Sequence, residues 1–179
     1  MKKSAWVLVA LLFVITTGCS VGPTRPDWVM KGSGAFGKDK KALYGVGIAE
    51  NIKSEALRRT TADNRAIAEI SKQLSTMSTS LMRDYMSSAS ATEQEKTSGE
   101  QYVENTVKTF SSNTMSGVKI IDRWDNGKVT YSLASLNIDE LKTMTDQINQ
   151  LSSQVRDYIK ANAEKAFDKL EAEQAKTQK

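Results

Sequence analysis

Histidine is absent from this sequence of 179 residues, and cysteine occurs once, at position 19. The lack of histidine excludes Ser-His-Asp and Cys-His nucleophiles and removes the commonest metal ligand. Carboxylates remain, but a cleft with paired carboxylates cannot be recognised in the sequence. We therefore assign no catalytic, metal-binding or cofactor-binding residue, and we expect a protein that is not an enzyme and needs no cofactor.

The charge is nearly balanced once the extreme N-terminus is set aside. The whole chain carries 25 basic and 21 acidic residues, a formal charge of +4. Lys2 and Lys3 lie in a segment that we expect to be removed, which leaves 23 basic residues against 21 acidic ones. No stretch concentrates positive charge on one face, so we expect no nucleic-acid partner. The length suits one folded domain.

The first twenty residues have the order of a bacterial lipoprotein signal peptide. Two lysines, a short apolar run and a small-residue segment follow one another: Lys2, Lys3, Ala5 to Ile15, and Thr16 to Ser20. The apolar run is too short to span a bilayer comfortably. Thr16 departs from the aliphatic residue usual at its position, and the alternative is an ordinary signal peptide with an incidental cysteine. We predict that residues 1–18 are removed and that Cys19 carries a covalent lipid, which anchors the protein in the membrane.

Ser20 and the segment that follows bear on where the protein lies. A serine after the cysteine resembles lipoproteins forwarded to the outer membrane in enteric-type bacteria, so we expect an outer-membrane protein whose body faces the periplasm. Residues 19–41 are rich in Gly, Pro and Lys and read as a tether. We expect Trp28 to pack on the domain, the alternative being a ligand-binding ring. The basic run Lys38 to Lys41 is either solvated or in contact with anionic lipid or glycan.

Two apolar-alternating runs meet across Asn126-Gly127 and predict a β-hairpin with a two-residue type I′ turn. This turn would place Trp124 opposite Val129. One face would be buried, with these residues on it: Val118, Ile120, Trp124, Val129, Tyr131 and Leu133. We therefore predict that Trp124 is a core residue. Asp122 would share that face, opposite Tyr131, and we expect it to bond a polar group or to meet water at the sheet edge.

The hairpin and the elements before it predict an α+β fold with a three-stranded antiparallel sheet. A strand is expected over Leu43 to Glu50, with glycines on one face. A long helix should follow, which begins between Asn51 and Ser54 and runs to about Ser88, and its alanine-rich start should pack closely on those glycines. A shorter helix is expected over Gln101 to Asn113. The order is strand, long helix, short helix, hairpin and long C-terminal helix, with the domain at 42–137.

Residues 138–179 are predicted to form one long helix that begins after the cap Asn137, with Glu140 reaching back to complete a capping box. Apolar residues hold a heptad spacing for about two and a half repeats: Leu141, Met144, Ile148, Leu151, Val155 and Tyr158. The early part would pack on the domain, and the part beyond Tyr158 would project. We therefore predict a partner interface at Val155, Tyr158 and Ile159.

Several short motifs lie between Pro26 and Asn137: Pro26-Asp27-Trp28-Val29, Tyr44-Gly45-Val46-Gly47-Ile48-Ala49, Ile121-Asp122-Arg123-Trp124, Asn126-Gly127 and Tyr131-Ser132-Leu133. With them this chain resembles the Lpp-twenty family of bacterial outer-membrane lipoproteins. The resemblance implies an α+β domain held at the outer membrane, in some members built into assemblies around the flagellum. The family has no established catalytic residues to transfer.

Two classes of function follow from these observations. The first is a structural or interaction lipoprotein of the bacterial envelope, which self-associates or binds an envelope protein and is in some cases linked to motility. The second is a binding protein or enzyme for envelope glycan or lipid. The second class would need a sizeable apolar cavity or a cleft with paired carboxylates, and a structure can show either.

Overall fold

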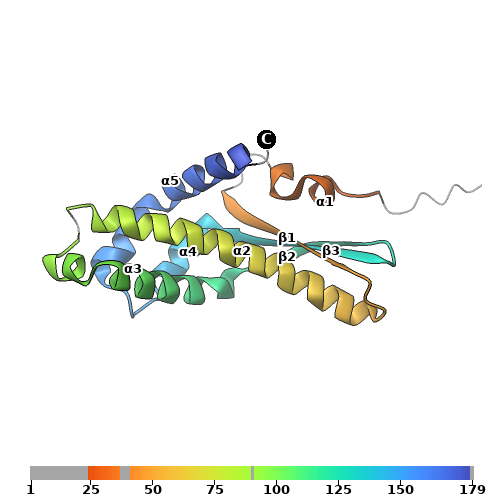
Figure 1. Ribbon diagram of the computed structural model, residues 1–179, viewed down its shortest axis with the longest axis horizontal. Coiled ribbons are helices and arrows are strands. Elements are labelled where there is room, and N and C mark those ends of the chain that lie inside the picture. Colours follow the sequence, from red (N-terminus) through yellow and green to blue (C-terminus); the bar gives the residue numbers. More distant parts are fainter. Residues whose placement is uncertain (1–23, 37–40, 90, 178–179) are drawn as a thin grey trace, which may run out of the picture.

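The structure, a computed structural model, describes residues 24–36, 41–89 and 91–177. Its strands are β1 (Ala42–Glu50), β2 (Lys119–Asp125) and β3 (Val129–Asn137). Its helices are α1 (Asp27–Lys31), α2 (Glu55–Met86), α3 (Glu93–Thr114), α4 (Ile138–Thr145) and α5 (Ser153–Thr177), with 3-10 turns η1 (Gly32–Ala35) and η2 (Met115–Gly117). The short α1 lies on one side of the sheet and α2 on the other (Figure 1). The predicted α+β class is confirmed.

The sheet is antiparallel and has the order β1-β3-β2. The second strand of the hairpin is therefore central, and it pairs with β1 along its whole length, from Ala42 opposite Asn137 to Glu50 opposite Val129. The helix α2 covers one side of this central strand. Accordingly Thr130 and Ser132, which alternate with the predicted apolar residues of β3, are only 2% and 0% exposed.

The hairpin turn differs from the predicted one. Trp124 pairs with Tyr131 rather than with Val129, because Asn126 stands before the two turn residues instead of within the turn. Its backbone N–H donates to the Val129 carbonyl at 3.3 Å, and its side-chain Oδ1 accepts from the Val129 N–H at 2.9 Å. Gly127 alone in this turn has a positive φ, +85°, which is the pattern of a type II′ turn. Near the turn the pairing moves by two residues, so the side chains from Asp122 to Asp125 keep their faces.

A β-bulge splits the predicted apolar face of β2. Ile120 lies opposite Ala134, but Asp122 already lies opposite Leu133, which leaves Ile121 as the extra residue. Ile120 consequently packs against the main core with α2, whereas Trp124 packs on the other side of the sheet. Ile121 itself is 51% exposed. The prediction of one continuous buried face on the hairpin is therefore wrong.

The long helix α2 packs against β1 as the glycine pattern predicts. A Cβ atom at Gly47 would overlap the carbonyl oxygen of Ala62, and one at Gly45 would overlap that of Ala66. Both alanines are fully buried, so the helix axis lies closer to the strand than larger side chains would allow. Ser54 caps the helix by accepting from the Leu57 N–H at 3.4 Å. The predicted length of this helix is confirmed.

The helix α3 is longer than the short helix predicted over Gln101 to Asn113. It begins at Glu93 rather than at Gln101, and Gly99, with φ +52°, marks a kink inside it. Thr92 and Glu95 form a capping box at its start. This cap stabilises a turn that is almost devoid of apolar residues, so the apolar pattern gives no sign of a helix before Gln101.

The C-terminal region is two helices rather than one, and it does not project. The chain turns between Thr145 and Ser153, and α5 then packs back against α2 and α4. Apolar residues continue along the buried side of α5 to its last turns: Val155, Ile159, Ala163, Ala166, Phe167 and Leu170. Val155 is 0% exposed and Ile159 is 1% exposed. The ring of Tyr158 packs edge-to-face on Tyr85 at a centroid distance of 5.2 Å.

These contacts correct the predicted partner interface. Val155, Tyr158 and Ile159 belong to the core of this chain, because the turn before α5 brings their apolar stripe onto α2. The cap at Asn137 is confirmed, since its Oδ1 accepts from the Asp139 N–H at 2.7 Å. Glu140 does not complete a capping box there, because its carboxylate accepts from Lys119 Nζ at 2.7 Å.

Candidate functional site

The segment that leads from the N-terminus packs directly on the sheet through α1. Trp28 and Val29 are buried, with 6% and 8% exposure. Trp28 Nε1 donates a hydrogen bond to Asp122 Oδ2 at 2.8 Å, so the predicted packing of Trp28 on the domain is confirmed. Gly32, with φ +57°, ends the helix. The expected tether at 19–41 therefore contains a folded piece, α1 followed by η1, at residues 27–35.

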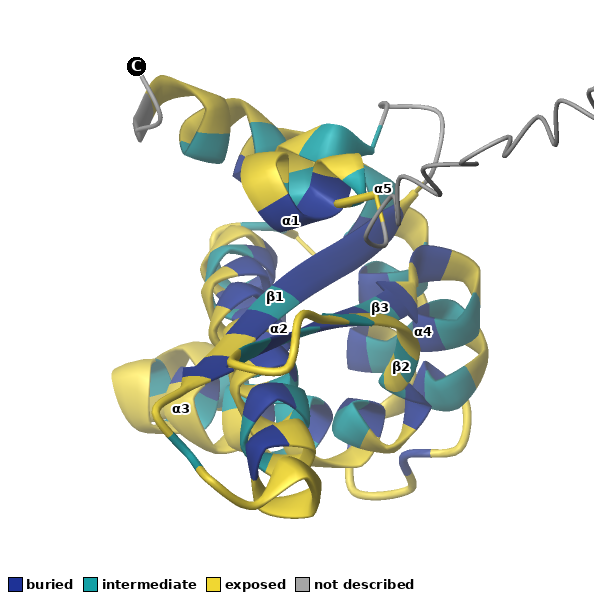
Figure 2. Cartoon of the chain, turned by 90° about the vertical axis from the view of Figure 1, so that its right-hand side faces the viewer, coloured by how far each residue is buried: buried dark blue, intermediate teal, exposed yellow. Residues whose placement is uncertain are grey.

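Beyond α1, the same side of the sheet carries a row of partly exposed apolar and aromatic residues. We call it the outer patch, and it consists of Val46, Ile48, Trp124, Val129 and Tyr131. Ile48, Tyr131 and Trp124 lie opposite one another across the three strands. Ile48 is 42% exposed. The burial pattern in Figure 2 shows α1 over only part of this side of the sheet.

Arg25 lies over the aromatic part of the outer patch. Its guanidinium carbon is 4.9 Å from the centroid of the Trp124 ring and 5.8 Å from that of Tyr131, within the range of cation–π contacts. The two rings meet edge-to-face, with centroids 5.8 Å apart. Trp124 is half-buried rather than a core residue, which corrects the prediction, because the short α1 does not reach across it.

Two ion pairs join α2 to the hairpin on the inner side of the sheet. Arg58, which is 5% exposed, pairs with Asp125 at 3.2 Å. Asp63 receives two bonds from Arg123, at 2.8 and 2.9 Å, and one from Ser132 Oγ at 2.6 Å. Burial alone would raise the pKa of Asp63, but these bonds and the Arg123 charge outweigh burial and lower it. Both pairs fix the helix on the sheet.

A carboxylate between two tyrosines joins α2 to α3. Glu95 accepts from Tyr85 Oη at 2.8 Å and from Tyr102 Oη at 2.7 Å. Burial, with the hydrogen bond to Glu95, raises the pKa of Tyr102 to about 12 and also raises the pKa of Tyr85, so both hydroxyls remain donors well above neutral pH. The cluster satisfies the polar groups of a buried helix contact and holds the first turn of α3.

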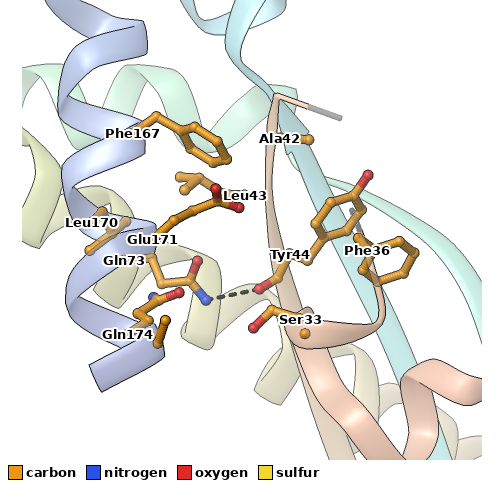
Figure 3. A pocket seen from close by; sticks show the side chains of 12 residues that line it. Ser33, Phe36, Ala42, Leu43, Tyr44, Gln73, Phe167, Leu170, Glu171 and Gln174 are labelled. Atoms are coloured by element: carbon orange, nitrogen blue, oxygen red, sulfur yellow. Dashed lines mark hydrogen bonds between the residues drawn. The ribbon is translucent and has the colours of Figure 1, made fainter. Parts of the chain in front are cut away.

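A hollow of about 170 Å³ lies between η1, β1 and the end of α5 (Figure 3). Stacked aromatic rings form one wall, with the centroids of Phe36 and Tyr44 3.9 Å apart. Gln73, which is 7% exposed, donates from Nε2 to the Tyr44 carbonyl at 2.8 Å. The lining also includes Ser33 and Glu171. The hollow is small for a drug-sized ligand, since ligand pockets usually measure about 300–1,000 Å³.

The predicted site residues thus have different outcomes. Cys19 lies outside the described residues, and Val155, Tyr158 and Ile159 lie in the core, away from the outer patch. Sequence reasoning missed Arg25 and the exposure of Ile48, although the alternation of Val46 and Ile48 already indicated one shared face. Among the described residues, no group of three or more Asp, Glu or Cys side chains is placed to hold a metal ion, and no helix is long and apolar enough to cross a bilayer.

Comparisons with known proteins do not assign this chain to a family. No protein-family model matches this chain, and no curated protein matches it. The resemblance to the Lpp-twenty family therefore stays an expectation from the motifs.

Proposed function

We propose that this chain is a non-catalytic lipoprotein of the outer membrane, anchored through Cys19, which acts by self-association or by binding another protein of the envelope. The order of residues 1–20 supports the anchor. The absence of histidine and the commitment of the single cysteine to lipid support a role without catalysis. Placement around a flagellum, which the resemblance implies for some family members, is part of this proposal.

One structural observation carries the proposal further than the sequence does. Trp28, which packs into the sheet, follows Cys19 by only nine residues. A fully extended chain spans at most about 3.3–3.6 Å per residue, so Trp28 lies within about 30 Å of the lipidated residue. A domain held by so short a connection stays close to the membrane surface. That arrangement suits a protein that acts on neighbours in or beside the membrane.

The test of the anchor is the Cys19→Ser variant, expressed alongside the wild-type chain in a bacterium that processes lipoproteins. We expect the wild type to incorporate labelled palmitate, to lose residues 1–18 and to fractionate with the outer membrane. The variant should remain uncleaved and unlabelled. Equal labelling of both chains would overturn the anchor. Cross-linking in cells, followed by mass spectrometry, then tests the interaction part, and a wild-type protein that cross-links neither to itself nor to an envelope protein would overturn it.

The hollow beside Gln73 favours ligand binding as the second candidate function. Its lining includes the aromatic residues Phe36 and Tyr44 and the amide, hydroxyl and carboxylate groups of Gln73, Ser33 and Glu171. Such a mixed lining suits a sugar-sized polar ligand, because polar groups can bond its hydroxyls. Among the described residues of the lining, Glu171 is the one carboxylate, whereas most glycosidases use two, so we infer binding and not hydrolysis. Titration of the purified domain with soluble peptidoglycan fragments, followed by NMR, tests this candidate with Gln73→Ala as the comparison.

A further inference from the structure

We propose that the outer patch and the exposed side of α1 lie against the lipid surface, so that the protein itself, and not only its acyl chains, contacts anionic phospholipid headgroups. This inference rests on the proposed anchor at Cys19. It adds an orientation: the side of the sheet that carries α1 faces the membrane, and α2 and α3 face away from it.

The first support is the character of the exposed residues on this side of the sheet. Met30, on α1, is 70% exposed, and Ile48 is 42% exposed. Trp124 and Tyr131 are half-buried beside them. Tryptophan and tyrosine suit a membrane interface because each ring has an apolar body and a polar end. The patch therefore combines the aliphatic and aromatic groups that enter the boundary between headgroups and acyl chains.

The second support is the place where the chain leaves this surface. The described chain begins at Thr24, one residue before Arg25, whose guanidinium lies over Trp124. Cys19 is five residues before Thr24, so its lipid lies within about 18 Å of the edge of the outer patch. Acyl chains at Cys19 must enter the bilayer. A surface so close to the point of insertion cannot turn far from the headgroups.

The third support is the charge of residues 24–36, which lie on this side of the sheet. They carry two basic residues, Arg25 and Lys31, against the acidic Asp27, a net charge of +1. Lys31 bonds Asp27 at 2.6 Å, whereas the guanidinium of Arg25 lies over the Trp124 ring in the outer patch. A positive charge on an apolar patch is complementary to anionic lipid, and each basic residue near such a surface adds to the attraction.

A second copy of the chain is the competing occupant of the outer patch. Copies anchored in one membrane meet through their sides, whereas the surface next to the anchor points at the lipid. The short connection to Cys19 therefore favours lipid. Contact between copies predicts a dependence on protein density, which lipid contact does not.

The experiment uses the lipidated, full mature chain with one new cysteine, which is its only free thiol because Cys19 is acylated. Met30→Cys and Ile48→Cys report on the proposed contact. Leu57→Cys is the matched control, because Leu57 is 57% exposed and lies on α2, on the other side of the sheet. Each thiol carries a fluorophore whose emission depends on polarity. The protein is reconstituted in vesicles of phosphatidylethanolamine and phosphatidylglycerol, and circular dichroism checks that each variant is folded.

We expect the emission at positions 30 and 48 to shift to shorter wavelength and to gain intensity in vesicles, with no change at position 57. Protein that floats with the vesicles but shows no shift at 30 and 48 would overturn the orientation and leave the anchor standing. A shift that appears only at high protein density would also overturn it, in favour of a second copy. Protein that does not float with the vesicles would instead refute the proposed anchor.

Discussion

The indole nitrogen of Trp28 donates a hydrogen bond to the carboxylate of Asp122 across 2.8 Å, and it joins residues 94 positions apart in the sequence. The ring of Trp28 also packs in a small second core with Val29, Tyr44 and Leu133. One bond and one ring therefore fix α1 to the sheet.

Removal of the Trp28 ring should release α1 from the sheet. We expect Trp28→Ala to cost about 3–5 kcal/mol of local packing free energy, so that the peptide bond after Lys31 becomes accessible to trypsin. Cleavage after Lys31, followed by mass spectrometry, measures this. Trp28→Phe is the control, because it keeps most of the apolar contact and loses only the hydrogen bond to Asp122. A hydrogen bond to a charged group contributes about 1.5–3 kcal/mol to stability. Equal cleavage rates in Trp28→Ala and the wild type would show that α1 is not held by its ring.

A single methyl group at Gly47 should destabilise the whole domain. The new Cβ would overlap the Ala62 carbonyl, and a backbone atom cannot move aside as a flexible side chain can. Overpacking costs about 1–3 kcal/mol and occasionally more, and we expect Gly47→Ala to reach at least the upper end of this range. Urea unfolding followed by circular dichroism measures the loss. Ile48→Ala, on the exposed face of the same strand, should cost much less, and an equal loss in both variants would contradict close packing at Gly47.

Much of the fold could be predicted from local patterns, and the errors have physical causes. The glycine pair in β1 and the alanine-rich start of α2 each indicate close approach, and they pack together. The bulge at Ile121 leaves no signal in the alternation of apolar residues, so the faces of β2 could not be separated. Thr130 and Ser132 are buried because Arg58 and Asp63 bond them, and such partners lie far away in the sequence.

The C-terminal helix shows the same limit in another form. The heptad spacing through Val155 correctly identifies a buried stripe, but a spacing does not say which surface buries it. The turn before Ser153 decides that, and it contains no proline or glycine to mark it. The outer patch was likewise hidden, because its exposure depends on how short α1 is. Sequence reasoning therefore found the elements, and tertiary contacts decided which surfaces remained open.

Truncation of Ile159 should behave as a core change and not as the loss of an interface. Ile159 is 1% exposed, so Ile159→Ala should lower the free energy of unfolding by about 2–5 kcal/mol. Thermal unfolding at two protein concentrations measures this, because an interface residue would give a loss that depends on concentration. Leu57→Ala, which removes a similar side chain from an exposed position, should change stability by less than about 0.5 kcal/mol. A stable Ile159→Ala variant with a changed oligomeric state would restore the interface interpretation.

The pair of Asp63 and Arg123 should make stability depend on acidity. The pKa of Asp63 is lowered in the folded chain because its bonds to Arg123 and Ser132 outweigh the effect of burial. A group with a lowered folded pKa contributes stability that is fully present above its unfolded pKa, about 3.9, and is lost as the pH falls through the folded value. We therefore expect Asp63→Asn to be less stable than the wild type at pH 7 and to lose less stability on acidification.

The measurement is the urea midpoint of both chains at neutral pH and at several values below about pH 4, where the unfolded carboxyl becomes protonated. The pKa of Asp125 is also lowered, because hydrogen bonds from Thr130, the Gly127 N–H and Arg58 outweigh the effect of burial. Asp125 should therefore keep some acid sensitivity in the variant. Asp168→Asn, at an exposed position on α5, controls for the loss of one negative charge. If the midpoints of Asp63→Asn and the wild type fell in parallel with pH, Asp63 would not be linked to folding, and the ion pair with Arg123 would not stabilise the contact between α2 and the hairpin.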